Sequence, residues 1–152
     1  MAVLTLLNSS PGMSATYTTT DITAVSRSAV VLTKEVRNFT QNGTFGTNNQ
    51  AKSGEVLEYR ISYTNTGTSP VSNLVINDAT PEYTSFVLAQ TDATPISLSG
   101  CAKVTPANAP PLPPLDCDAP QAAGGTGALS WTFTGNLPGG AAGAVIYRAL
   151  VD

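Results

Sequence analysis

The chain has 152 residues, of which 11% are charged and none is histidine, and its formal net charge is -3. It therefore lacks the commonest general base and the commonest transition-metal ligand among side chains. The acidic balance offers no basic patch, which speaks against nucleic acid or an anionic membrane as partner. No apolar run approaches the roughly 20 residues of a transmembrane helix, so we expect no membrane insertion.

Residues 1–27 form an N-terminal extension with strand propensity but no broad hydrophobic face. The stretch "SATYTTTDITAVS" is rich in Thr and nearly free of charge, and it needs a partner sheet to fold. One interpretation is an edge strand of this domain or the end of a preceding module. The other is a donor strand that pairs with a neighbouring copy, which builds a filament when repeated head to tail. The candidate donor residues are Thr16, Thr18, Thr20, Ile22 and Ala24.

Residues 28–152 are punctuated by Gly and Pro and contain short segments whose apolar residues recur with a period of two. The segments are expected to be strands, and none of them keeps helical spacing for three turns. The chain is therefore predicted to be all-β, an antiparallel Ig-like β-sandwich of about seven to nine strands, with Trp131 in its core. In chain order the expected strands are Ser28–Val36, Leu57–Thr64, Pro70–Asp78, Tyr83–Gln90, Pro95–Gly100, Leu129–Gly135 and Ala144–Asp152.

The two cysteines, Cys101 and Cys117, flank a Pro-rich loop. A disulfide between them would remove roughly 3 kcal/mol of unfolded-chain entropy, and it favours an oxidising, extracellular location. Two free buried thiols are the alternative. A metal site would need more ligands than Asp116 and Asp118 supply.

Three stretches resemble a known family: "LTKEV", "SGEVLEYRISYTNTGTSPVSNLVINDATPEYTSFV" and "GALSWTFTGNLPGGAAGAV". Their order and spacing, with the paired cysteines between the last two, resemble the domain of unknown function called DUF11. The resemblance covers roughly residues 29–151. It implies an Ig-like sandwich in an exported bacterial or archaeal surface protein, often in tandem copies, and it transfers no catalytic residues.

Alternation places Lys34 on the same strand face as Leu32 and Val36, where an ammonium needs a partner or a path to water. In some Ig-like surface modules such a lysine forms an isopeptide bond. We favour the simpler interpretation, in which the amine of Lys34 reaches solvent at the end of the sandwich. The candidate partners for an isopeptide bond are Asn65, Asn77 and Asp78.

No phosphate loop, metal triad or nucleophile elbow is present, so no catalytic site, metal site or cofactor is predicted. Loop carboxylates could bind calcium, although no repeat spacing organises them. We predict a non-enzymatic structural protein of the cell surface, a subunit of a filament or stalk joined by strand donation. The alternative is an adhesin or carbohydrate-binding module, for which exposed aromatics should be grouped. In the sequence Phe39, Phe45 and Tyr83 are dispersed.

Overall fold

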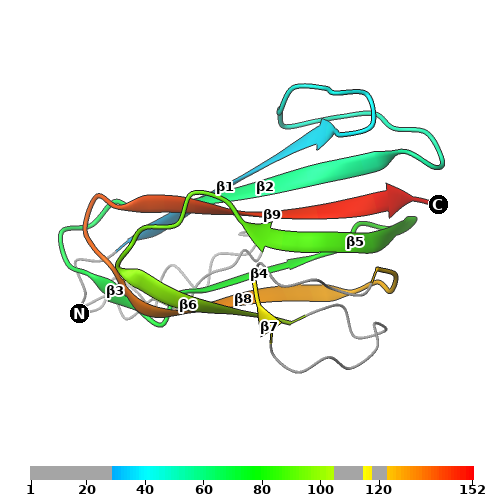
Figure 1. Ribbon diagram of the computed structural model, residues 1–152. Coiled ribbons are helices and arrows are strands. Elements are labelled where there is room, and N and C mark those ends of the chain that lie inside the picture. Colours follow the sequence, from blue (N-terminus) through cyan, green and yellow to red (C-terminus); the bar gives the residue numbers. More distant parts are fainter. Residues whose placement is uncertain (1–28, 105–114, 118–122) are drawn as a thin grey trace, which may run out of the picture.

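The computed structural model describes residues 29–104, 115–117 and 123–152. The extension of residues 1–27, with the candidate donor residues Thr16, Thr18, Thr20, Ile22 and Ala24, lies outside these residues. The described part contains nine β-strands and no helix (Figure 1). The strands are β1 (Val30–Asn38), β2 (Val56–Asn65), β3 (Val71–Ser72), β4 (Val75–Ala79), β5 (Thr84–Thr91), β6 (Leu98–Val104), β7 (Leu115–Asp116), β8 (Ala128–Leu137) and β9 (Ala142–Val151).

The strands form two antiparallel sheets that face each other (Figure 1). The first sheet has the order β1-β2-β9-β5, and the second has the order β3-β8-β6-β7, with β4 also paired to β8. The predicted all-β sandwich is thereby confirmed. The Ig-like strand order is not confirmed. Here the last strand, β9, pairs with β2, whereas in an Ig domain the fifth strand pairs with the second strand.

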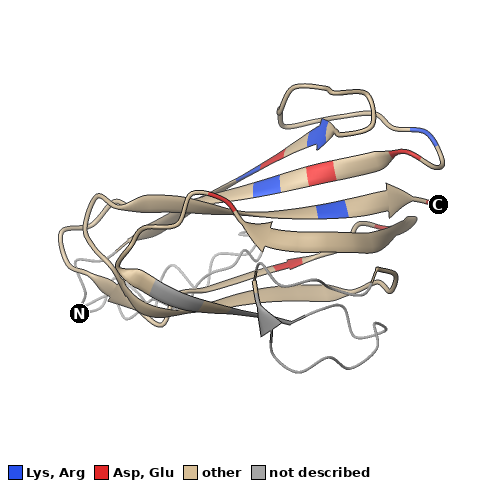
Figure 2. Cartoon of the chain, in the orientation of Figure 1, with Lys and Arg blue, Asp and Glu red and all other residues tan. Residues whose placement is uncertain are grey.

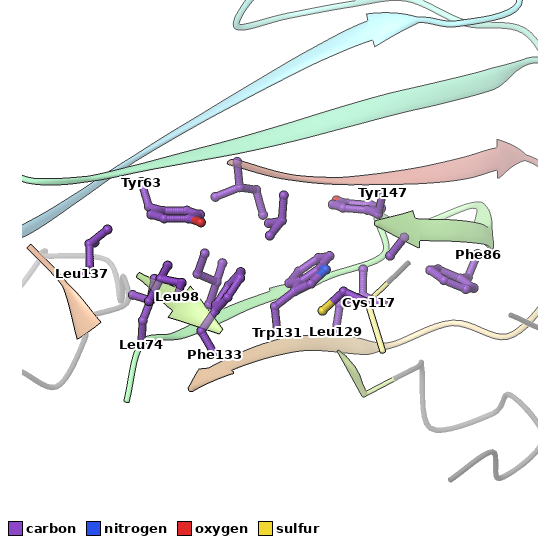
Figure 3. Packing of buried hydrophobic residues seen from close by; sticks show 14 residues of the cluster. Tyr63, Leu74, Phe86, Leu98, Cys117, Leu129, Trp131, Phe133, Leu137 and Tyr147 are labelled. Atoms are coloured by element: carbon purple, nitrogen blue, oxygen red, sulfur yellow. The ribbon is translucent and has the colours of Figure 1, made fainter. Parts of the chain in front are cut away.

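Alternation along the strands explains which side chains enter the core. On β8, Leu129, Trp131 and Phe133 are at most 1% exposed, as expected for residues two positions apart on the inner face. They meet Tyr63 from β2 and Tyr147 from β9, which point inward from the opposite sheet (Figure 3). Trp131 is therefore a core residue, as the sequence predicted.

The structure joins Cys101 and Cys117 in the predicted disulfide, with their Cα atoms 5.4 Å apart. The Cys117 N–H also donates a hydrogen bond to the Cys101 carbonyl, where β7 pairs with β6. Cys117 is fully buried and belongs to the hydrophobic core. The disulfide thus closes the loop between β6 and β7 from the core side.

Asn65, at the end of β2, holds one end of the sandwich together. Its side-chain Nδ2 donates to the carbonyls of Ser69 (2.8 Å) and Leu137 (3.0 Å), and its Oδ1 accepts from the N–H groups of Gly67 (3.0 Å) and Ala29 (3.4 Å). The residue is completely buried. A single amide therefore ties the entry to β1, the turn after β2 and the end of β8.

Candidate functional site

An ion pair connects the two sheets along one side of the sandwich. Nζ of Lys34 on β1 lies 2.6 Å from Oδ2 of Asp78 on β4, and the two side chains are 42% and 17% exposed. The ammonium also lies 4.9 Å from the ring centroid of Tyr59 and 5.4 Å from that of Tyr147, within the range of a cation–π contact. The amine is thus partly exposed at the side of the sandwich and ends on a carboxylate, where we expected it to reach solvent at the end of the sandwich.

The two tyrosines beneath this pair are stacked, with ring centroids 4.7 Å apart. The Tyr147 hydroxyl donates a hydrogen bond to the carbonyl of Ala79, 3.2 Å away. Burial, and secondarily the negative charge of Asp78, raises the pKa of both Tyr147 and Tyr59. Both hydroxyls therefore stay neutral at physiological pH.

Of the three candidate isopeptide partners of Lys34, the structure brings only Asp78 to the amine. Asn65 pairs in register with Val30, at the start of β1, and its amide is fully used in hydrogen bonds within the fold. Asn77 is exposed, because it points to the opposite face of β4 from Ile76 and Asp78. An amide bond between Lys34 and Asp78 would require a neutral amine and the loss of one water. The contact found is an ion pair, and the cross-link stays a prediction.

Among the described residues, most of the β1 edge that faces away from β2 has no hydrogen-bonding neighbour. Backbone groups alternate between the two sides of a strand. Val36 exchanges two hydrogen bonds with Gly46 on the outer side, at 2.8 and 3.1 Å. By alternation the N–H and C=O groups of Val30, Leu32 and Lys34 face the same side, and no residue in the described ranges hydrogen-bonds them.

The outer edge of β4 likewise has no hydrogen-bonding neighbour in the part of the chain that the structure describes. The Leu74 carbonyl accepts a hydrogen bond from the Phe133 N–H on β8, so Val75 and Asn77 turn their backbone groups away from that strand. Because Lys34 on β1 contacts Asp78 on β4, the two open edges border the same side of the sandwich. We name this surface, made of β1 residues 30–34 and β4 residues 75–77, the open side.

The other two sheet edges are at least partly covered by the chain itself. On β5, Phe86 donates to the carbonyl of Gly125 (3.0 Å) and accepts from the N–H of Gly124 (2.6 Å). On β6, part of the edge pairs with the short strand β7. Uncovered strand edges are unusual in soluble proteins because they pair with other chains. The open side is therefore the candidate interaction site.

A second cluster of side chains lies on the outer face of the first sheet, where the charges on β1, β2 and β9 gather (Figure 2). Glu58 on β2 is 2% exposed and forms ion pairs with Arg37 of β1 and Arg148 of β9. Beside Glu58, Arg60 of β2 pairs with Glu35 of β1, with 2.7 Å between Nη2 and the carboxylate. The cluster joins the three strands side by side.

Two aromatic rings from the loop between β1 and β2 cover this cluster. Cζ of Arg148 lies 3.5 Å from the ring centroid of Phe39, and Cζ of Arg60 lies 4.1 Å from that of Phe45. Arg37 lies near both rings. The expectation that Phe39 and Phe45 are dispersed was wrong, because the loop folds back and sets both rings over Arg37, Arg60 and Arg148.

Sequence reasoning missed this cluster as a unit. The alternation of Glu58 and Arg60 with apolar neighbours marked the outer face of β2, but only the pairing of β9 with β2 reveals Arg148 as a partner. In the described residues no group of three or more His, Cys, Asp or Glu side chains could hold a metal ion. Calcium binding therefore stays a prediction.

Among the described residues, no helix has the length and hydropathy needed to cross a membrane. The chain matches no protein-family model, no curated protein and no solved structure. The resemblance to DUF11 thus stays a prediction.

Proposed function

We propose that this protein is a non-enzymatic structural protein of the cell surface, a subunit of a filament or stalk whose copies join by β-strand donation. The observation that carries the proposal is the open side, where two neighbouring strand edges present backbone groups that no described residue pairs with. Strand addition to such an edge provides main-chain hydrogen bonds for affinity and side-chain pockets for specificity. The two remaining edges are partly covered by the chain, so the open side is the preferred docking place.

The occupant we assign to the open side is the Thr-rich extension, residues 1–27, of a second copy. This segment has strand propensity and almost no charge, and it cannot bury a hydrophobic face by itself. In the sequence it directly precedes the residues that lead into β1. Donation from copy to copy is heterologous and need not close, so it produces a linear polymer.

Two features support a location outside the cell. The disulfide joins the partly buried Cys101 to the core residue Cys117, and such bonds persist in oxidising compartments. The open strand edge suits an assembly protein that finds its partner at high local concentration. The proposal assigns no catalytic step to any residue.

Deletion of residues 1–26 tests the donor. We expect the truncated chain to fold and to stay monomeric in sedimentation and negative-stain microscopy under conditions in which the full chain polymerises. A Pro at Thr23 should weaken assembly by removing a ladder N–H. If truncation lowers the melting temperature and leaves the assembly state unchanged, the extension is an edge strand of its own domain and the filament mechanism is wrong.

A matched pair of variants tests the acceptor. Val31 on β1 and Val75 on β4 are 49% and 41% exposed, so lysine at either position leaves the core intact. An edge lysine discourages pairing with another strand. We expect V31K to block assembly if β1 accepts the donor, and V75K to do so if β4 accepts it. Polymerisation unchanged in both variants would rule out the open side.

The second candidate is an adhesin or carbohydrate-binding module, which the grouping of Phe39 and Phe45 over arginines favours. Phe39 is 37% exposed, enough to offer part of a ring to a sugar face. Binding of the full chain to a panel of glycans, lost in F39A, would support this function. Absence of binding throughout the panel would leave the structural proposal as the only one.

A further inference from the structure

The described chain enters and leaves the first sheet at opposite ends. Both β1 and β9 are antiparallel to β2, so they run parallel to each other. Their first residues lie level, because Asn65 pairs with Val30 and donates its N–H to the carbonyl of Ala141. The C-terminal end of β9 lies at the far end of the sheet (Figure 1), about 30 Å away for strands of this length.

We propose that this arrangement makes the domain a load-bearing element, in which β1, β2 and β9 carry tension between Ala29 and Asp152. A pull on these two residues drives β1 and β9 in opposite directions along their axes, with β2 between them. The hydrogen bonds of both ladders are then loaded in shear and must fail together. In a zipper geometry the same bonds would open one after another at a lower force.

The hydrogen-bonded ladders that β2 forms with β1 and β9 are long enough to carry tension. β2 forms nine register pairs with β1, from Val30↔Asn65 to Asn38↔Leu57, and nine with β9, from Val56↔Leu150 to Thr64↔Ala142. β9 is held on its other side by β5. Within the described residues β1 has a neighbour on its outer side only at Val36, so it is the strand that should detach first.

Side chains reinforce the weaker strand. Arg37, Glu58 and Arg148 form one row across β1, β2 and β9, since Glu58 pairs in register with both arginines. Opposite charges placed directly across a ladder favour its register, and sliding of β1 would separate them. The Lys34–Asp78 ion pair additionally fastens β1 to the second sheet. Detachment of β1 therefore breaks a ladder, a charge row and a bond between the sheets.

This inference rests on the proposed function only for the source of the load. In an assembly under tension, a donor segment held by a neighbouring copy would pull on Ala29 and hence on β1, and an attachment at Asp152 would supply the opposing pull. The resistance itself belongs to the single domain. It can be measured on one molecule whether or not the chain polymerises.

Single-molecule force spectroscopy on the full chain tests the inference by comparing two pulling directions. In the first, handles are attached at the N-terminus and at Asp152, which loads the ladders in shear. In the second, handles are attached at the N-terminus and at a bio-orthogonal side chain replacing Thr68, next to the start of β1, which peels β1 from β2. We expect a several-fold higher unfolding force in the first direction. Equal forces in the two directions would overturn the proposal.

Reduction of the disulfide and substitution of two carboxylates test which parts of the domain carry the load. The disulfide excludes the residues between Cys101 and Cys117 from extension, since their Cα atoms are 5.4 Å apart and separated by 16 positions. Reduction should lengthen the unfolding step by about 50 Å without lowering the shear force, and a fall of that force to the peeling value would contradict the load path. In E58Q the shear force should fall more than in E35Q, whose parent carboxylate is 34% exposed. The reverse order would show that the charge row carries no load.

Discussion

Glu58 and Arg148 are 90 positions apart in the chain, yet the Arg148 Nε donates a hydrogen bond of 2.6 Å to a carboxylate that is almost completely buried. The same carboxylate accepts a hydrogen bond of 2.7 Å from the Nε of Arg37. One carboxylate thus pairs with two arginines from the strands on either side. A buried charge is tolerated only when it is paired in this way.

Replacing Glu58 by Gln should destabilise the fold by about 2 kcal/mol, because it leaves two guanidinium groups without their carboxylate. The arginines are 29% and 24% exposed, so water offsets part of the loss. Urea unfolding measures the change. The control is E35Q, which breaks a more exposed pair and should cost less than about 1 kcal/mol. Equal losses in the two variants would contradict the special role of Glu58.

Stability should fall steeply in alkaline solution. Burial raises the pKa of Tyr59, Tyr63 and Tyr147 above the ordinary value of about 10. The native state therefore keeps protons that the unfolded state releases. This contribution is complete below pH about 10 and is lost as the pH rises further, by up to about 1.4 kcal/mol per pH unit for each buried tyrosine.

Urea unfolding at increasing pH, followed together with tyrosinate absorbance, checks this expectation. We expect part of the tyrosinate signal to appear only when the chain unfolds. In Y147F, which also loses the hydrogen bond to Ala79, the pH dependence should be shallower. Full ionisation of all tyrosines in the native protein would show that these three hydroxyls are not protected.

The intact mass of protein from its natural source should lie two hydrogen masses below that of the reduced chain, because Cys101 and Cys117 are joined. We expect no further loss, since Lys34 and Asp78 meet as an ion pair at a solvent-exposed rim. A deficit of one additional water, absent in K34M, would establish the amide cross-link instead. Alkylation of free thiols without prior reduction would disprove the disulfide.

Asn65 should be far more sensitive to substitution than Asn77. In N65A the carbonyls of Ser69 and Leu137 and the N–H groups of Gly67 and Ala29 each lose a hydrogen bond to a buried side chain, which should cost roughly 2–4 kcal/mol. Asn77 is exposed, so N77A should stay within about 0.5 kcal/mol of the wild type. Thermal and urea unfolding of both variants provide the comparison. A mild effect of N65A would mean that water replaces the lost hydrogen bonds.

The faces of the strands were determined by the sequence alone. A period of two is a local property that alternation expresses directly, so the inward positions on β8, Leu129, Trp131 and Phe133, were predictable. The disulfide was also within reach of the sequence, since only two cysteines are available. The strand faces depend on residues close together in the sequence, and the disulfide has only one possible pair of cysteines.

Only the tertiary structure decided which strands lie side by side. The position of β9 between β2 and β5 brings Arg148 to Glu58. After β2 the chain passes to the second sheet, where β4 places Asp78, and not Asn77, beside Lys34. The open edge of β1 likewise depends on where the loop carrying Gly46 returns. The alternation of apolar and polar residues indicates which face of a strand is buried, but it does not indicate which other strand lies beside it. That choice is made by the free energy of burying all apolar faces together, a sum over residues far apart in the chain.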